Sequence, residues 1–332
     1  MRPSISIQHK THGIRDTGRV PCGESHVSCH EARVSCLQGI SLVAILAAVV
    51  TAGALGAACG QGGKAQDSAQ VKVTVTLGLF GDFVRQVGGD RVQVSVLVPS
   101  GADVHTYEPP PGQIAKLSTA KLVVMNGLDL EAGLEKVIRE NASSSATVLE
   151  LASGLPTIQD NPHLWLDVQI AMTYVERIRD ALASVDPAGA DAYRANAEPY
   201  VSQLQQLDIE VATAVQSIPP ERRKLVTFHD AFPYLARRYG LEIVAFVVES
   251  PGKEPSAQEV SDLAKAIRDE KVPAVFKEPE YSASILTLAA SDANVQLCTL
   301  NAHAFVGEVK SYVDLMRFNA RELARCLGGT SG

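Results

Sequence analysis

Residues 188–218 read AGADAYRANAEPYVSQLQQLDIEVATAVQSI and predict one long amphipathic helix in the middle of the chain. Its apolar residues recur at steps of four and three: Tyr193, Ala197, Tyr200, Leu204, Leu207, Val211, Ala214 and Ile218. Such steps place them in one stripe along a helix. At 1.5 Å per residue the helix would extend about 45 Å, which is enough to run along two lobes.

Prolines mark the limits of this helix. Asp186-Pro187 is a typical start signal, and Pro219-Pro220 ends the pattern. Pro199 conflicts with a helix interior, so we expect either a kink there or a later start.

Short runs rich in β-branched residues flank the helix on both sides and alternate with helical patterns. The strand-like runs are 71–77, 92–98, 121–126 and 147–151 before the helix, and 224–228, 242–248, 272–277 and 295–300 after it. Helical patterns occupy 79–89, 129–140, 230–239, 256–270, 282–293 and 307–326, and 99–112 reads as a turn region. This alternation predicts an α/β fold with two parallel-sheet lobes, 71–187 and 219–328, joined by a rigid helix over 188–218.

The composition is that of a globular protein, with 332 residues, 46% hydrophobic and 20% charged. A formal net charge of −7 argues against nucleic acid as a partner, because that would require a basic face.

The N-terminus has the features of an export signal. Residues 40–58, ISLVAILAAVVTAGALGAA, form an uncharged apolar run that ends in small residues before Cys59. Cys59 resembles the acylated cysteine of bacterial lipoproteins; simple cleavage and a retained anchor are the alternatives. Residues 1–33 are too long for the start of a signal, so 1–58 is expected to combine a signal with an over-extended start. Residues 59–70 then read as a flexible tether.

Outside 1–58 the histidines are His105, His163, His229 and His303, and each lies on a loop at a strand end or a helix start. Taken singly, each is interpreted as a capping or loop residue, and their spacing matches no zinc finger or HExxH helix. Ligands of parallel sheets bind beyond the carboxyl ends of the strands, however, and neutral imidazole is the usual nitrogen ligand of zinc. Together the four predict a metal site between the lobes.

Four stretches of the chain resemble the zinc- and manganese-binding solute-receptor family of ABC transporters. They are PSGADVHTYEPPPGQIAKLSTAKLVVMNG (99–127), NPHLWLDVQIAM (161–172), FHDAFPYLARRYGLEI (228–243) and VFKEPEYSASILTLAASDANVQLCTLNA (275–302). The resemblance covers about residues 71–327. It implies two (β/α) lobes joined by one rigid helix, with a metal cleft between them.

The resemblance also implies a ligand set, with His105, His163 and His229 as the first three ligands. The fourth position, an aspartate in the family, falls on Asn301. Because an amide is a poor neutral ligand, either water completes the shell or His303 does. A histidine at 229 is typical of zinc-type members, and the missing carboxylate disfavours Mn²⁺, which prefers oxygen.

Carboxylates are expected behind the histidines, since metal-bound imidazoles donate their second N–H to such groups. The candidates are Glu108, Asp167, Asp230 and Glu278, with helix capping or a solvated loop as the alternative for Asp167 and Asp230. Trp165 is expected to pack beneath the site. Cys298 and Cys326 are expected to form a disulfide between the strand 295–300 and the last helix, with two free thiols as the alternative.

The resemblance, together with the export signal, implies an exported receptor that captures Zn²⁺ and delivers it to an ABC permease and its ATPase. The resemblance implies a monomer, without enzyme activity, held on the extracytoplasmic side of the membrane by a lipid at Cys59. A Mn²⁺ receptor of the same family, a three-histidine zinc hydrolase and a surface adhesin are the alternatives. Because imidazole must be deprotonated to bind, affinity is expected to fall as the pH drops through about 6.5.

Overall fold

The structure is a computed structural model that describes residues 70–248, 251 and 256–329. The signal over 1–58, Cys59 and all of the tether 59–70 except Gln70 lie outside the described residues. Within them, no helix is both long and apolar enough to cross a membrane.

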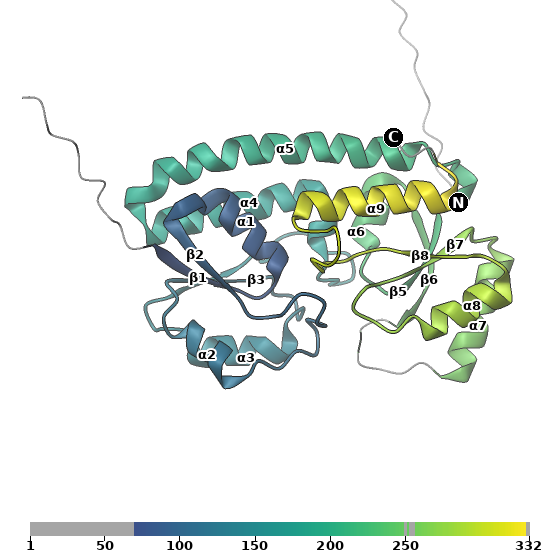
Figure 1. Cartoon of the computed structure of the whole chain (residues 1–332), viewed down its shortest axis with the longest axis horizontal. Helices are drawn as coiled ribbons and strands as arrows, with labels where there is room; N and C mark the ends of the chain where they lie inside the picture. The colour runs from purple at the N-terminus through teal and green to yellow at the C-terminus, as the bar shows by residue number, and fades with distance from the viewer. Residues whose placement is uncertain (1–69, 249–250, 252–255, 330–332) are drawn as a thin grey trace, which may run out of the picture. The chain divides into compact units, whose positions relative to one another are not determined.

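The N-terminal lobe is built on a four-stranded parallel sheet in the order β2-β1-β3-β4. Its strands are β1 (Val71–Val75), β2 (Val92–Val96), β3 (Leu122–Met125) and β4 (Thr147–Glu150). The helices of this lobe are α1 (Gly78–Gly88), α2 (Pro111–Leu117) and α3 (Ala132–Asn141), with α2 and α3 on the side away from α1 (Figure 1). The predicted turn region 99–112 runs into α2, which begins at Pro111 because a proline is tolerated in the first helical turn.

The C-terminal lobe repeats the same strand order with β6-β5-β7-β8, again all parallel. Its strands are β5 (Lys224–His229), β6 (Glu242–Val248), β7 (Ala274–Lys277) and β8 (Gln296–Thr299). Its helices are α6 (Pro233–Tyr239), α7 (Ala257–Asp269), α8 (Ser284–Ala293) and α9 (Tyr312–Leu327). The predicted α/β class with two parallel-sheet lobes is confirmed.

The lobes are joined by the long helix α5 (Ala190–Gln216), which runs across both sheets with α9 beside it, whereas α4 (Val168–Val185) packs against α1 and α5 (Figure 1). Of the two alternatives expected at Pro199, the later start is not seen, because α5 begins at Ala190 and includes Pro199. Pro199 and Ala195, whose carbonyl loses its helical donor, are both exposed, so water can hydrate that carbonyl.

One hydrophobic core extends from the N-terminal sheet under α5 into the C-terminal lobe. The face of α5 that enters it includes Tyr193, Leu204, Leu207 and Val211, as the sequence pattern predicts. A smaller core lies beneath α7 and α8. Because the first core is continuous across the lobes, the loops at their facing edges are held by packed elements on both sides.

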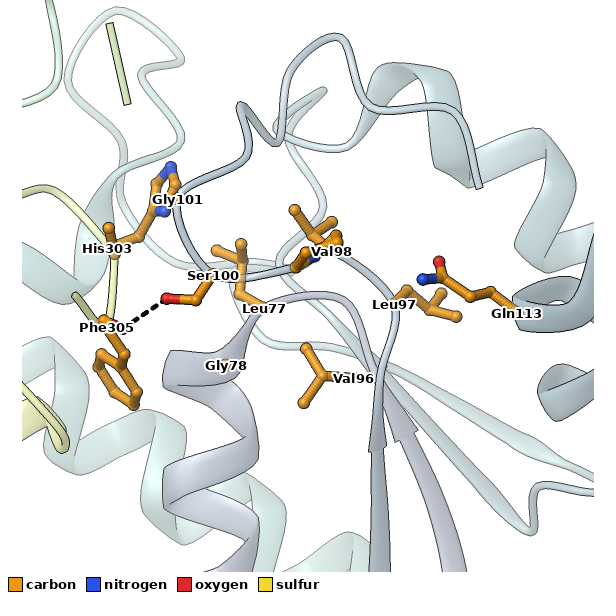
Figure 2. A pocket seen from close by; sticks show the side chains of 12 residues that line it. Leu77, Gly78, Val96, Leu97, Val98, Ser100, Gly101, Gln113, His303 and Phe305 are labelled. Carbon is orange, nitrogen blue, oxygen red and sulfur yellow. Dashed lines mark hydrogen bonds between the residues drawn. The ribbon is translucent and has the colours of Figure 1, made fainter. Parts of the chain in front are cut away.

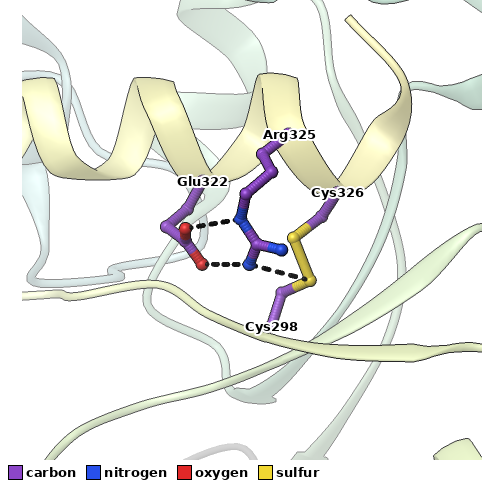
Figure 3. The surroundings of a disulfide bond; sticks show 4 residues. All are labelled: Cys298, Glu322, Arg325 and Cys326. Atoms are coloured by element: carbon purple, nitrogen blue, oxygen red, sulfur yellow. Dashed lines mark hydrogen bonds and ion pairs between the residues drawn. A yellow bond between two sulfur atoms is a disulfide. The ribbon is translucent and has the colours of Figure 1, made fainter. Parts of the chain in front are cut away.

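A disulfide joins Cys298 of β8 to Cys326 of α9. Figure 3 shows Arg325 beside it, bound to Glu322 on the same helix and directed toward the sulfur of Cys298. The bond fixes the C-terminal helix to the strand that leads into the loop carrying His303.

Candidate metal-binding site

The structure brings His105, His163 and His229 together between the lobes. His105 lies on the loop after β2, His163 comes just before the 3-10 helix η2 (Leu164–Leu166), and His229 is the last residue of β5. One ring nitrogen from each lies within 4.8 Å of the other two. His163 and His229 are buried and His105 is partly buried. This is the size of cluster that can hold one metal ion.

Glu278 holds the ring of His229. It follows β7 and its Oε1 lies 2.7 Å from Nδ1 of His229, with both side chains buried. A buried carboxylate accepts the Nδ1 proton, so Nε2 of His229 carries a lone pair toward the other histidines. Glu278 therefore lies where the sequence analysis expects an outer carboxylate, and its role behind a metal ligand stays a prediction.

Asn161 holds the ring of His163 in the same way. Its Oδ1 accepts from the main-chain N–H of His163 at 3.1 Å and lies 3.0 Å from Nδ1. Its amide nitrogen donates to the main-chain carbonyl of Asp230 at 2.5 Å and to the Asp230 carboxylate at 3.3 Å. These acceptors fix the amide orientation, so Nδ1 of His163 must be the donor. Asp230 therefore acts on His163 through Asn161.

The two inward nitrogens face each other: Nε2 of His163 lies 3.3 Å from Nε2 of His229. Each Nδ1 is used as a donor, so neither neutral ring has a proton left to place between the Nε2 atoms. Two lone pairs that face each other repel, but a cation between them would be bound by both nitrogens.

Burial keeps the rings neutral. It lowers the pKa of His229 to about 4, partly offset by Asp103 and Asp230. The pKa of His105 also falls to about 4, through burial first and then the nearby His229. Burial lowers the pKa of His163 well below its usual value. Neutral imidazole is the form that binds a metal ion.

Asp103, rather than Glu108, is the carboxylate that orders the loop of His105. Its Oδ1 accepts from the main-chain N–H of His105 at 3.0 Å and from the hydroxyl of Tyr281 at 3.0 Å. Glu108 is exposed, so its expected role behind a histidine is not seen. Because Tyr281 belongs to the other lobe, Asp103 ties the loop of His105 across the cleft.

A second bond crosses the cleft nearby. Figure 2 shows Ser100 donating to the carbonyl of Phe305 at 2.6 Å, with His303 beside Gly101. These residues line a cavity of about 290 Å³ at the edge of the cleft. The loops of His105 and His303 thus meet at this opening.

Asn301 does not direct its amide at the three histidines. Its Oδ1 accepts from the N–H of Ala304 at 2.8 Å, and its amide nitrogen donates to the carbonyl of Ala304 at 2.7 Å. Asn301 is therefore part of a closed turn, 301–304, which presents His303. The ring of His303 is buried, with Nδ1 3.4 Å from Oε1 of Glu280.

Asp167 caps a helix. Its side chain accepts from the N–H of Gln169 at 3.0 Å at the start of α4, which is the capping alternative. Trp165 packs beneath the site as predicted: its ring centroid is 5.3 Å from that of His163. Its indole N–H also donates to the carbonyl of Ala302 at 2.8 Å and so supports the turn of His303.

The sequence interpretation assigned no role to Asp103 or Glu280 and none to the amide of Asn161. One signal for Glu280 was present: in KEPEY the two glutamates are two residues apart directly after a strand, so their side chains can face the same way. Asp103 and Asn161 each lie two residues before a histidine, the spacing of an Asx turn.

Comparison with known proteins identifies this arrangement. A family profile described as "Zinc-uptake complex component A periplasmic" matches residues 73–326. The chain belongs to this family. Its members are solute-binding receptors rather than enzymes, so the hydrolase alternative is wrong.

The matches to individual relatives extend over nearly the whole length of each relative. The manganese-binding lipoprotein MntA of Halalkalibacterium halodurans is 32% identical over 84% of this chain and 95% of its own. The iron-binding protein YfeA of Yersinia pestis is 30% identical over 82% of this chain and 91% of its own. The solved periplasmic zinc-binding protein TroA of Treponema pallidum has a TM-score of 0.73 at 27% identity, over 78% of this chain and 99% of that one. The chain is thus similar to proteins that are named for binding three different metals: manganese, iron and zinc.

Proposed function

We propose that this protein is the zinc receptor of an ABC importer and that His105, His163 and His229 hold the ion. The observation that carries this proposal is the pair of Nε2 atoms of His163 and His229, which face each other at 3.3 Å without a proton to share. Glu278 and Asn161 fix both rings in that orientation. Such fixed, neutral and buried imidazoles are built to coordinate a cation.

The donor set favours Zn²⁺ over Mn²⁺. The clustered ligand atoms are all imidazole nitrogens, which suit zinc, whereas Mn²⁺ prefers carboxylate and carbonyl oxygens. Asn301, at the family's carboxylate position, uses its amide in a turn instead. The manganese and iron names of the relatives make Mn²⁺ and Fe²⁺ the competing cargoes to test.

As a member of this family the protein works on the extracytoplasmic side of the membrane. Its cargo passes to a permease driven by an ATPase, and the lipoprotein relatives support an anchor at Cys59, which lies outside the described residues. The described chain already contains the whole three-histidine cluster, which supports a monomeric receptor. Labelled palmitate should enter the wild-type protein but not Cys59→Ser.

The cargo is tested by calorimetry on chelator-treated protein. We expect one Zn²⁺ to bind with submicromolar affinity and Mn²⁺ to bind more weakly. Changes to the outer partners of metal ligands lower metal affinity about 10- to 100-fold, and His163→Ala, which removes a ligand, should lower zinc affinity by more than this. Glu270→Gln serves as the control, because Glu270 is a half-exposed carboxylate of the C-terminal lobe that pairs with Lys224. Zinc binding no tighter than micromolar, or unchanged in His163→Ala, would overturn the proposal. Tighter Mn²⁺ than Zn²⁺ binding would overturn the zinc assignment.

A further inference from the structure

Two glutamates follow strand β7 and both turn inward. Glu278 and Glu280 flank Pro279, which is exposed, while both carboxylates are fully buried. Alternation along an extended segment places residues two apart on the same side. Two carboxylates therefore point from one short segment into the cleft.

Each of these carboxylates faces the Nδ1 atom of a histidine. Glu278 Oε1 lies 2.7 Å from Nδ1 of His229, and Glu280 Oε1 lies 3.4 Å from Nδ1 of His303. The first pair presents Nε2 of His229 to the cluster. The second pair is arranged in the same way: the carboxylate of Glu280 faces Nδ1 of His303, and Nε2 on the other side of the ring is buried.

The second pair is left without other partners. Among the described residues, neither oxygen of Glu280 nor Nε2 of His303 has a hydrogen bond, although these atoms are buried. Buried polar atoms in native proteins are nearly always satisfied, and an unpaired buried carboxylate is especially unfavourable. Such a pair points to a cationic ligand that is not part of the chain.

The position of His303 is fixed toward the cluster. Asn301 closes the turn 301–304, and the indole of Trp165 holds the carbonyl of Ala302 within it. The ring of His303 is close enough for its charge to interact with those of His105 and His229. His303 lies outside the group of three histidines whose ring nitrogens are within 4.8 Å of one another, so its ring would have to move toward them to reach an ion that they hold.

We propose that His303 is the fourth ligand of the metal site and that Glu280 positions it. In this arrangement the Glu280 carboxylate accepts a hydrogen bond from Nδ1–H of His303, and His303 binds the cargo ion through Nε2. This rests on the proposed function of the three histidines. A fourth nitrogen in place of an oxygen ligand raises the preference for Zn²⁺ over Mn²⁺. Glu280 is thus a positioning residue that determines specificity through His303.

The test compares Glu280→Gln, His303→Ala and the double variant, with Glu308→Gln as the control. Glu308 is an exposed carboxylate on the same loop as His303. We expect Glu280→Gln to weaken Zn²⁺ binding about 10- to 100-fold, and Mn²⁺ binding less, because outer partners of metal ligands have effects of this size. The double variant should bind no more weakly than His303→Ala, and Glu308→Gln should match wild type.

X-ray absorption at the zinc edge gives a second readout, with four imidazoles expected in wild type and three in His303→Ala. Thermal unfolding of the metal-free Glu280→Gln protein should show no loss of stability, since neither oxygen of the buried Glu280 carboxylate has a hydrogen bond among the described residues that the change would remove. A merely structural Glu280 would instead lower stability and leave the ratio of zinc to manganese affinity unchanged, which would overturn the proposal.

Two further outcomes would also overturn it. One is unchanged zinc affinity in both single variants; the other is a Glu280→Gln effect that persists in full in the His303→Ala background, which would mean that Glu280 acts without His303. Either result leaves the proposed function standing if wild type binds zinc and His163→Ala does not. Failure of wild type to bind zinc removes both proposals.

Discussion

Nε2 of His163 and Nε2 of His229 lie 3.3 Å apart, and the Nδ1–H of each ring donates to a fixed acceptor. His163 is held by an amide from its own loop, and His229 by a carboxylate from a neighbouring strand. The two halves of the pair come from different lobes. The site is therefore oriented by the packing of the two lobes as well as by each loop alone.

The amide of Asn161 should matter to metal binding. In Asn161→Ala, His163 loses the acceptor that keeps its proton on Nδ1, so the lone pair on Nε2 is no longer held toward the metal site. We expect zinc affinity to fall about 10- to 100-fold, as for other outer partners of metal ligands. Calorimetry measures this, with Thr157→Ala, an exposed hydroxyl on the same loop, as the control. An affinity equal to that of wild type would show that the ring is held by packing alone.

Metal binding should resist acid further than the sequence suggests. Free histidine would protonate near pH 6.5, but burial lowers the pKa of His105 and His229 to about 4. The neutral, binding form persists between those values, so zinc affinity should decline mainly as the pH approaches about 4. Competition titrations from pH 7.5 to 4 measure this. A tenfold loss for each pH unit beginning at 6.5 would contradict it.

The same shifts predict the pH dependence of the metal-free protein. Between about pH 6.5 and 4 the unfolded chain binds protons at these histidines and the folded chain does not. The free energy of unfolding should therefore fall as the pH is lowered through this range. Urea unfolding at several pH values tests this, and His229→Gln should reduce the slope. Buried carboxylates with raised pKa values, such as that of Glu131, contribute a slope of the opposite sign, so the comparison with His229→Gln is the decisive one. An equal slope in wild type and His229→Gln would contradict the prediction.

The single tryptophan should report on the site. Trp165 is fully buried with its ring 5.3 Å from that of His163. A cation placed at His163 changes the electrostatic field at the indole, so emission should change until one equivalent of Zn²⁺ is bound. His163→Ala should abolish the change. Binding seen by calorimetry with unaltered emission would mean that the ion sits away from His163.

The disulfide should stabilise the C-terminal lobe. It closes a loop between Cys298 and Cys326, which are separated by 28 positions in the sequence, and chain entropy gives about 3 to 4 kcal/mol of stability for such a loop. Reduction should lower the melting temperature of wild type. The Cys298→Ala/Cys326→Ala variant should start lower and not respond to reductant. An equal response of both proteins would show that the reductant acts elsewhere.

Much of the architecture was predictable because it depends on local patterns. The apolar stripe of 188–218 and the β-branched runs on either side are enough to predict a long helix between two parallel sheets. Pro199 shows the limit of such rules. The local rule predicts a kink or a later start at this residue, but α5 includes it, and its exposed position lets water hydrate the carbonyl that loses its donor.

Residue types and their loop positions by themselves made His105, His163, His229 and His303 candidate ligands, because strands of a parallel sheet bring their carboxyl ends to one edge. The family resemblance then selected the first three. Only the tertiary structure decided which groups hold them. The partners of His229 and His303 are glutamates far away in sequence, and Asn301 proved to close a turn. Hydrogen-bond partners depend on distances of a few ångströms between separate elements, which packing of the two lobes sets and no local pattern encodes.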